Sequence, residues 1–450
     1  MESEITHIQS PYFSKNTFQT QIDIIKKASE EADKKIQYYN AHDEDILYAI
    51  QIVEDYLKKT HRICYGGQAI NAYLPSKYKF YDPQYTIPDY DVFTPTQYND
   101  IIMIVNNLKK AGFSEVFVRQ GMHVGTIKIY VNFIAVADIT ALDPYIYRLL
   151  SKRSTRVDGI SYLDSNTLRM LMYLELSRPR GEVSRWEKIF ERLMLFNEFV
   201  PTQVCPNYKL QPLHKPNLTE QQVHYIVNFI IDNQCIFAGA DLVPFYESAL
   251  KDHRANINWL LHSNKPILFY SSNTIEDAKK ILSELNVSRT TVQKTFTIKY
   301  YKSTNMDMRP SCAVISQGKS PVLYIIHQHE CHSYFNVPIN KKEYGKILKI
   351  ASMDTLITLY FSFGFIKNAH FEAIECLANQ LVNLSMKARK QHDKFIFPFI
   401  SIKCSGHQTT MPSLIRKRIK HGTTTRKNLK RILNIATGVI GVTIRNKTRR

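Results

Sequence analysis

The chain has 450 residues, of which 44% are hydrophobic, and its formal net charge is +19 with a pI near 9.4. This length exceeds one ordinary domain, so we expect two or three. No apolar run approaches the roughly 20 residues of a membrane helix, and the N-terminus lacks a basic region followed by an apolar stretch. The composition predicts a soluble, intracellular protein with polyanionic partners, which are nucleic acid, other polyphosphates or an anionic membrane surface.

Helices and strands alternate along the first half of the chain. Apolar residues at helical spacing predict helices over 18–38 and 43–60. A short strand precedes Gly66-Gly67, and the next strand begins at Asp89. The remaining predicted elements are a helix over 96–111, strands over 115–119, 123–131 and 133–139, and helices over 164–178 and 184–199. This alternation indicates an α/β or α+β class.

Two aspartates stand at i and i+2 in the sequence Ile-Pro-Asp-Tyr-Asp-Val-Phe. Asp89 and Asp91 therefore point to one face if they lie on a strand. Adjacent carboxylates repel each other, and divalent cations between them relieve that repulsion. Phosphoryl transfer uses such cations to neutralise a triphosphate, so the pair is a candidate metal site.

A third carboxylate and a glycine turn complete the candidate site. Asp138 ends an apolar run and is the best candidate for the third ligand, with Asp143 as a second choice that Pro144 places in a turn. Gly66-Gly67 lies between a strand and a helix, where backbone N–H groups can approach a phosphate. A Gly-Gly pair alone is weak evidence, but the combination is much more specific.

The whole pattern resembles the polymerase-β-type nucleotidyltransferase superfamily. The segments Tyr-Gly-Gly-Gln-Ala-Ile at 65–70 and Pro-Asp-Tyr-Asp-Val-Phe-Thr-Pro at 88–95 are similar to the poly(A) polymerase catalytic subunit of large cytoplasmic DNA viruses of the poxvirus, giant-virus and African-swine-fever type. So are Val-Ala-Asp at 136–138 and Trp-Glu-Lys at 186–188. The similarity is clearest from about 60 to 200.

This resemblance implies adenylate addition to mRNA 3′ ends, with ATP as donor and Mg²⁺ or Mn²⁺ as the ion. It carries the metal-binding role onto Asp89, Asp91 and Asp138, and the glycine turn onto Gly66 and Gly67. It further implies a degenerate second nucleotidyltransferase-like lobe. Giant-virus members resemble homodimers, whereas poxvirus members pair with a methyltransferase-type subunit, and the sequence does not choose between them.

The second half repeats the first weakly. Residues 235–242 look like 63–70, and 267–272 with the helix after it look like 90–95 with theirs. Aligning Asp277 with Asp100 puts Pro266 and Leu268 where Asp89 and Asp91 stand. If the repeat is real, the second copy keeps the scaffold without the carboxylates; the alternative is a chance likeness of two α/β segments.

Basic residues cluster around Pro179, just after the candidate site. Arg178, Arg185 and Lys188, with Arg180, are candidates for clamping a triphosphate or an RNA backbone. Ordinary surface charge is the alternative.

The cysteines and histidines raise a second metal hypothesis. The seven cysteines are scattered with no paired spacing, which suits a reducing compartment. In His-Gln-His-Glu-Cys-His, His327, His329 and Cys331 would share one strand face, and Cys404 and His407 would complete a zinc tetrahedron. The alternative is a polar strand end.

We predict N-terminal helices at 1–60, a catalytic module at 61–200, a degenerate lobe at 219–345, C-terminal helices at 346–412 and a basic tail at 413–450. From Leu414 onward the tail has Lys and Arg but no Asp or Glu.

Tyr300 and Tyr301 stand beside Lys299 and Lys302, an interleaving that suits base stacking on single-stranded RNA. Ordinary packing explains most of the tyrosines.

The expected function is template-independent polynucleotide adenylyl transfer from ATP to RNA 3′ ends. Two alternatives remain: another terminal nucleotidyltransferase that adds UMP or CMP or modifies a protein or small molecule, and a non-catalytic RNA-binding processivity subunit on the same scaffold. The expected partners are ATP, an RNA 3′ end, and a second copy or a viral subunit, with no membrane. The expected location is the cytoplasmic viral factory, with packaging in the virion as a further possibility.

Overall fold

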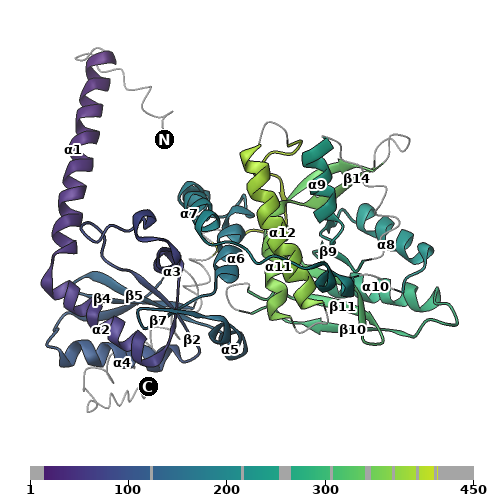
Figure 1. Cartoon of the computed structure of the whole chain (residues 1–450), viewed down its shortest axis with the longest axis horizontal. Helices are drawn as coiled ribbons and strands as arrows, with labels where there is room; N and C mark the ends of the chain where they lie inside the picture. Colours follow the sequence, from purple (N-terminus) through teal and green to yellow (C-terminus); the bar gives the residue numbers. More distant parts are fainter. Residues whose placement is uncertain are drawn as a thin grey trace, which may run out of the picture.

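The computed structural model describes residues 15–121, 125–213, 217–252, 265–304, 308–339, 346–366, 370–391, 395–409 and 413. Two lobes lie side by side, each built on a mixed sheet, with helices between them (Figure 1). The predicted basic tail, from 414 onward, lies outside the described residues. No helix in the described part of the chain is long and apolar enough to cross a membrane.

The first lobe begins with two long helices and then forms a seven-stranded sheet. Its strand order is β3-β4-β5-β2-β1-β7-β6. Its elements are α1 (Lys15–Ala41), α2 (Glu44–Thr60), β1 (Ile63–Tyr65), α3 (Gly66–Tyr73), β2 (Tyr90–Thr94), α4 (Gln97–Lys110), β3 (Val116–Gln120), β4 (Thr126–Val131), β5 (Ile134–Ala141), α5 (Pro144–Arg153), β6 (Thr155–Val157), β7 (Ile160–Tyr162), α6 (Ser165–Leu176) and α7 (Trp186–Phe199). Helices α2 and α4 bury their apolar faces against the sheet.

Three of these elements were not predicted. Helix α5 begins at Pro144, directly after Asp143, whose carboxylate accepts hydrogen bonds from the N–H groups of Tyr145 (2.9 Å) and Ile146 (3.2 Å). Asp143 is therefore the N-cap of a helix, which explains why a proline can follow it. Strands β6 and β7 have three residues each and are too short for a periodic signal.

The second lobe repeats the strand order of the first. Its sheet has the order β10-β11-β12-β9-β8-β14-β13-β15, so β8 to β14 correspond one by one to β1 to β7. Its elements are α8 (Glu220–Asp232), β8 (Ile236–Phe237), α9 (Leu242–Asp252), β9 (Ile267–Ser271), α10 (Thr274–Val287), β10 (Phe296–Tyr301), β11 (Cys312–Gln317), β12 (Ser320–His327), β13 (His332–Pro338), β14 (Ile347–Ala351), α11 (Met353–Ser362), α12 (Phe371–Lys390) and β15 (Cys404–Ser405). The predicted fold class, with a second degenerate lobe, is confirmed.

One turn is preserved in both lobes at the same place. In the first lobe the Thr94 hydroxyl donates to Asp100, and the Thr96 N–H donates to the Thr94 hydroxyl at 3.0 Å. In the second lobe the Ser271 hydroxyl donates to Asp277 in the same way. Asp277 and Asp100 therefore occupy equivalent positions in the two lobes, as the predicted alignment of the repeat has them.

The glycine segments align one residue away from the prediction. Ile63 pairs with Phe93 in the first lobe, and Ile236 pairs with Tyr270 in the second. Ile236 is thus the counterpart of Ile63, whereas the prediction matched Cys235 to it. The strand register, which a sequence comparison does not contain, decides the alignment.

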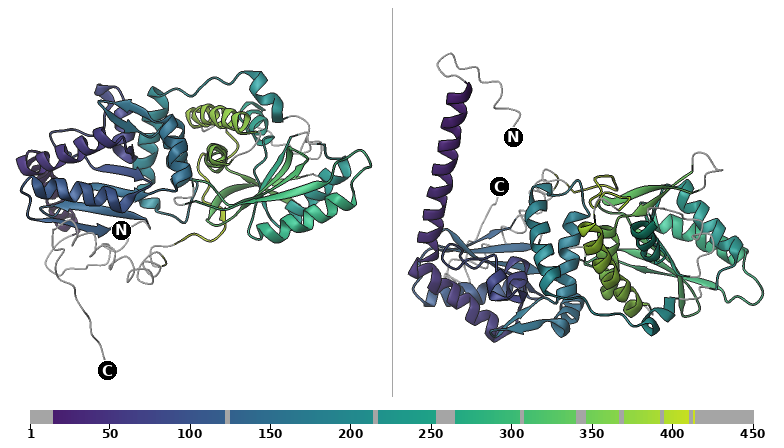
Figure 2. Two further views of the ribbon diagram at one scale, coloured as in Figure 1. Left: turned by 90° about the horizontal axis from the view of Figure 1, so that it is seen from below. Right: turned by 45° about the horizontal axis from the view of Figure 1, so that its top comes forward.

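Helices α6, α7, α11 and α12 fill the space between the two sheets (Figures 1 and 2). The Tyr173 hydroxyl in α6 lies 3.1 Å from the Ser385 hydroxyl in α12. The Ser333 N–H, at the start of β13, donates to the Ser177 carbonyl after α6 at 3.0 Å. The lobes are therefore joined through a shared helical layer.

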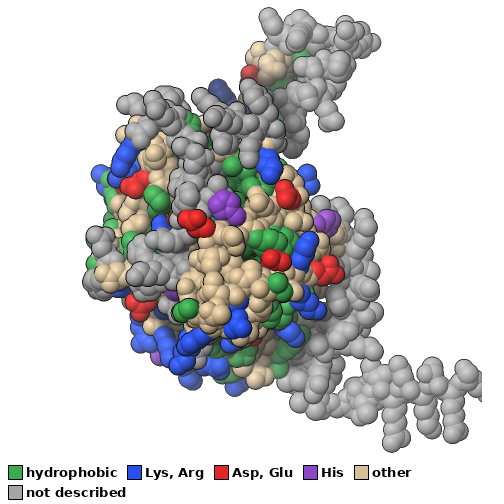
Figure 3. All heavy atoms as spheres, turned by 90° about the vertical axis from the view of Figure 1, so that its right-hand side faces the viewer, with side chains coloured by type: hydrophobic (Ala, Val, Ile, Leu, Met, Phe, Trp, Pro, Cys, Tyr) green, Lys and Arg blue, Asp and Glu red, His purple; other side chains and the backbone are tan. Residues whose placement is uncertain are grey.

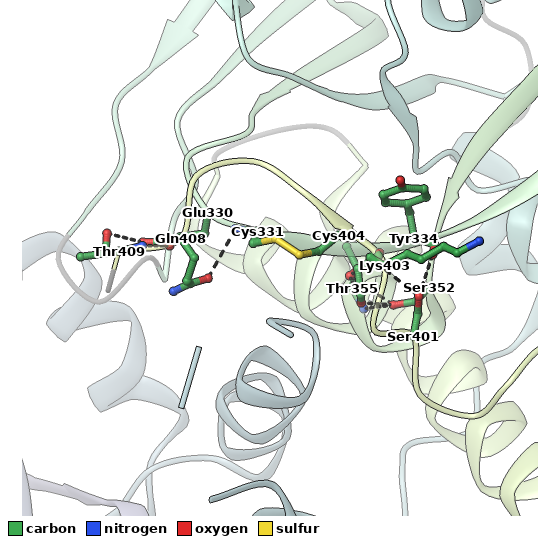
Figure 4. Close-up of a disulfide and its surroundings, with 11 residues drawn as sticks. Glu330, Cys331, Tyr334, Ser352, Thr355, Ser401, Lys403, Cys404, Gln408 and Thr409 are labelled. Carbon is green, nitrogen blue, oxygen red and sulfur yellow. Dashed lines mark hydrogen bonds between the residues drawn. A yellow bond between two sulfur atoms is a disulfide. The ribbon is translucent and has the colours of Figure 1, made fainter. Parts of the chain in front are cut away.

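Two disulfides join segments far apart in the sequence, Cys205–Cys376 and Cys331–Cys404. The second ties β15 to the start of β13 (Figure 4). The scattered spacing of the cysteines predicted neither bond, because separations of 171 and 73 residues leave no local signal in the sequence.

The zinc hypothesis is also wrong. Cys331 and Cys404 come together as predicted, but their sulfurs are bonded to each other and are not thiolates. The connection from His327 to Cys331 joins β12 to β13 and is not a strand. Among the described residues no group of three or more His, Cys, Asp or Glu side chains is arranged to hold a metal ion.

The surface carries two further features. Helix α1 projects from the first lobe (Figure 1), and its side chains are almost all exposed. Figure 3 looks onto the end formed by the second lobe, where Lys and Arg side chains gather toward the lower margin of the view. The basic character therefore extends onto the second lobe.

Candidate active site

Neighbouring strands bring the three predicted aspartates together. Asp91 lies on β2 and pairs with Asp138 on β5, and Asp89 immediately precedes β2. On the other side of β2, Asp91 pairs with Tyr65, the last residue of β1. Residues paired across a sheet point to the same face. The acids therefore share one face, next to the glycine turn.

The pKa of Asp91 shows that the three carboxylates lie close enough to repel one another. Burial, together with the charges of Asp89 and Asp138, raises the pKa of Asp91 to about 7. The charges of Lys128 and Arg185 oppose this rise. The cluster therefore resists full ionisation at neutral pH, and an added cation would relieve it.

Lys128 was not predicted as part of the site. It stands on β4 opposite Asp138, and its ammonium lies 2.5 Å from the Asp138 carboxylate. This contact supplies positive charge to the cluster and raises the pKa of Lys128 despite its partial burial. Local spacing does not point to Lys128, because its position beside Asp138 depends on the pairing of β4 with β5.

The glycine turn lies directly against the acids. Gly66 has a φ of +72°, which favours glycine, and a Cβ there would lie 2.1 Å from an Asp91 carboxylate oxygen. A Cβ on Gly67 would lie 2.1 Å from the Tyr81 hydroxyl and 3.0 Å from the Arg192 guanidinium. The absence of a side chain at both glycines therefore lets Asp91 lie against Gly66 and Tyr81 lie against Gly67.

The predicted basic residues separate into two groups. Partial burial and the charges of Arg192 and Arg185 lower the pKa of Lys188, so these three cations lie near one another. Arg185 also acts on Asp91, which places this group beside the acids.

Arg178 lies elsewhere. Its charge acts on Tyr270 of the second lobe, where it opposes the rise that burial causes in the tyrosine pKa. Arg192, whose guanidinium stacks over the Phe80 ring at 4.4 Å, was missed as a site residue although it stands close to Gly67.

A divalent ion fits the donor chemistry of this face. Carboxylate oxygens are the ligands that Mg²⁺ and Mn²⁺ prefer. The raised pKa of Asp91 shows that the acids repel one another. In the structure, however, the three carboxylates do not converge on one point. The Asp138 carboxylate is instead paired with the Lys128 ammonium. Asp89, Asp91 and Asp138 are the residues that would hold the ion.

The strand order, the glycine turn and the acids on one face of the first lobe are typical of a nucleotidyltransferase fold, and the second lobe repeats the strand order without the acids. Residues 51–182 match the sequence model of the family described as poly(A) polymerase catalytic subunit. The predicted resemblance to these viral proteins is thereby confirmed for that part of the chain.

Individual relatives agree with this result. The chain is 26% identical over 214 residues to a poly(A) polymerase catalytic subunit of Acanthamoeba polyphaga mimivirus, an alignment covering 44% of this chain and 35% of that protein. It is 27% identical over 166 residues to one of African swine fever virus (strain Badajoz 1971 Vero-adapted), covering 36% of this chain and 35% of that protein. The matched part thus spans about a third of each relative.

A solved structure resembles the fold over a greater length. The Megavirus polyadenylate synthase superposes with a TM-score of 0.70 over 92% of this chain and 85% of that chain, at 16% sequence identity. The likeness therefore extends over both lobes and supports the assigned fold.

Proposed function

We propose that the chain is a template-independent polynucleotide adenylyltransferase that adds AMP from ATP to the 3′ end of RNA. The observation that carries this proposal is the acid cluster of Asp89, Asp91 and Asp138 beside the Gly66-Gly67 turn. The match to the poly(A) polymerase catalytic subunit family supports RNA as acceptor and ATP as donor. The net charge of +19 suits both polyanions.

The donor triphosphate binds on the β1 side of the acids in this proposal. The Gly66-Gly67 backbone positions the β- and γ-phosphates, and Arg185, Lys188 and Arg192 balance their charge. A divalent ion held by the aspartates would supply positive charge against the triphosphate and the developing charge on the α-phosphate.

The acceptor hydroxyl approaches on the β5 side. Asp138 accepts the proton of the RNA 3′-hydroxyl as its oxygen attacks the α-phosphorus of ATP. A new P–O bond forms, the bond between the α- and β-phosphates breaks, and pyrophosphate leaves. Lys128 keeps the Asp138 carboxylate in place before the acceptor arrives.

Incubation with an RNA oligomer, Mg²⁺ or Mn²⁺ and each NTP separately tests this proposal. Extension with ATP alone is the expected result. Extension with UTP or CTP instead favours another terminal transferase. Tight RNA binding without extension by any NTP favours a non-catalytic processivity subunit, and overturns the proposed activity.

Helix α1 supports a homodimer as the working form. Phe18, Ile22, Ile25, Ser29, Ala32, Ile36 and Tyr39 follow the alternating spacing of four and three residues of a coiled-coil seam. Ile25 and Ile36 are 65% and 56% exposed, so the seam is open to a partner. Ile25→Glu with Ile36→Glu would convert a dimer to a monomer in sedimentation experiments. A native chain that sediments as a monomer favours a separate subunit as the partner.

The relatives named above come from large DNA viruses. By analogy we place this chain in the cytoplasmic viral factory of an infected cell, acting on viral mRNA, and packaging in the virion is compatible with this role. Fractionation of infected cells and of purified particles with an antibody against the chain tests both locations.

A further inference from the structure

The sheet face that carries the acids continues past them to the edge of the first sheet. Asp138 pairs with Lys128, and Lys128 pairs with Arg119 on β3, the edge strand. Paired residues share a face, so Lys128 and Arg119 extend the row of acids. This extension lies on the side away from β1 and Gly66, where the proposed function places the RNA acceptor.

Two aromatic rings lie next to Arg119 on the same face. Phe117 pairs with Tyr130, and their rings stack with centroids 5.0 Å apart and an interplanar angle of 6°. The Arg119 guanidinium lies 5.0 Å from the Phe117 centroid and 5.8 Å from the Tyr130 centroid. Arg119 is exposed and both aromatic residues are half-buried. A cation thus stands over a stacked pair that solvent can reach.

A third aromatic ring, that of Phe133, lies beside this pair on a backbone with a positive φ, which bulky residues disfavour. Phe133 follows Asn132 in the turn from β4 to β5, and their φ angles are +66° and +49°. Such a two-residue turn favours glycine at its second position, and a bulky residue there is strained. Phe133 is 70% exposed, so burial does not offset this strain, and its ring centroid lies 5.4 Å from that of Phe117.

We propose that Phe117, Tyr130 and Phe133, here called the aromatic platform, stack the bases at the 3′ end of a single-stranded RNA acceptor, while Arg119 contacts its backbone. This inference rests on the proposed function. Aromatic rings interleaved with arginine are the usual means of holding single-stranded RNA, because every base offers a π-face. The platform follows Asp138 on the acceptor side, so an RNA strand lying on it points its terminus at the acids.

Binding of a fluorescent oligoadenylate of about 15 nucleotides, without ATP or metal, tests the platform. Phe117→Leu with Tyr130→Leu should weaken binding about tenfold or more. Arg119→Ala should weaken it and flatten the salt dependence by about one phosphate contact. The matched control is Tyr98→Leu with Arg156→Ala: Tyr98 is on α4, Arg156 is on β6 at the opposite edge, and this variant should bind as the native chain does.

Phe133→Gly gives a readout that a structural role would not produce. Glycine relieves the strained turn, so the melting temperature should rise while RNA affinity falls about fivefold. A structural role for Phe133 predicts a lower melting temperature instead.

Native RNA affinity in the platform variants overturns the inference. So does a loss confined to the KM for ATP, which would make the platform a donor site. A change in oligomeric state with unchanged RNA affinity would make it a protein-binding surface, and overturns it too. Because binding is measured without ATP, a chain that binds RNA through the platform yet adds no nucleotide refutes the proposed activity alone.

Discussion

The two lobes share one strand order and differ in one row of residues. In the first lobe the row across β2, β5, β4 and β3 reads Asp91, Asp138, Lys128 and Arg119. In the second lobe the paired positions on β9, β12, β11 and β10 are Leu268, Tyr324, Val314 and Lys299. The acids and the lysine that neutralises them are absent together.

This difference separates the scaffold from the site. Both lobes keep the Thr94- or Ser271-type turn that holds an aspartate at the start of the following helix. The second lobe replaces its charged row by buried side chains, and Leu268, Tyr324 and Val314 belong to the core. A charged row without a ligand is unfavourable to bury, so its retention in one lobe marks the lobe that we propose performs chemistry.

Removing the acid pair should have the largest effect. Asp89→Ala with Asp91→Ala should lower the rate of RNA extension by at least ~10³, about 4 kcal/mol, because the charge that holds the ion is gone. Asp232→Ala, an exposed acid on α8 of the second lobe, is the control and should keep its rate. Retained polymerisation in the double variant would refute the site.

Removing a disulfide from the second lobe should lower the stability of the protein without changing the rate of RNA extension. Cys331→Ser with Cys404→Ser should lower the free energy of unfolding by about 2–4 kcal/mol, because the bond closes a long loop. Urea unfolding measures this loss, and the rate per folded molecule should stay native. An unchanged urea midpoint would show that the bond does not stabilise this lobe.

A side chain at Gly66, in the glycine turn of the first lobe, should slow RNA extension. Gly66→Ala puts a methyl group against Asp91 at a φ of +72°, and we expect about 10²-fold slower extension, or about 3 kcal/mol. Gly112→Ala is the matched control, since its φ is +99° but nothing lies within 4 Å of the new Cβ. Equal effects of the two changes would assign the loss to backbone strain alone.

Replacing Lys128 should reveal the repulsion among the acids. Lys128→Met, which makes its position apolar like Val314, should lower the metal-free free energy of unfolding by about 2 kcal/mol. Mg²⁺ should then raise the melting temperature of this variant more than that of the native chain. Lys110→Met on α4 serves as control, and an equal Mg²⁺ response in both variants would contradict the role of Lys128.

The smallest effect concerns pH. The pKa of Asp91 is raised from 3.8 to about 7, so the folded state keeps a proton that the unfolded state has lost between these values. Stability without metal should fall as pH rises through this interval, and Asp91→Asn should remove that fall. We expect the Asn variant to be more stable by about 1 kcal/mol at about pH 7.5 and no more stable at about pH 4. Parallel pH profiles of the two proteins would contradict this.

The sequence predicted what local spacing controls. The period of two placed Asp89 and Asp91 on one face, and helical periodicity located α2 and α4 to within a few residues. The sequence did not reveal Lys128, Arg119 or the platform, because their proximity to the acids comes from the pairing of β3, β4 and β5. The two disulfides and the one-residue shift in the repeat likewise depend on contacts between distant segments.

The most direct test of the account is a crystal structure with Mn²⁺ and a non-hydrolysable ATP analogue. We expect anomalous density for Mn²⁺ between Asp89, Asp91 and Asp138, with the triphosphate against Gly66-Gly67 and no metal at Leu268. Ions and nucleotide bound elsewhere, with these carboxylates free of metal at saturation, would contradict it.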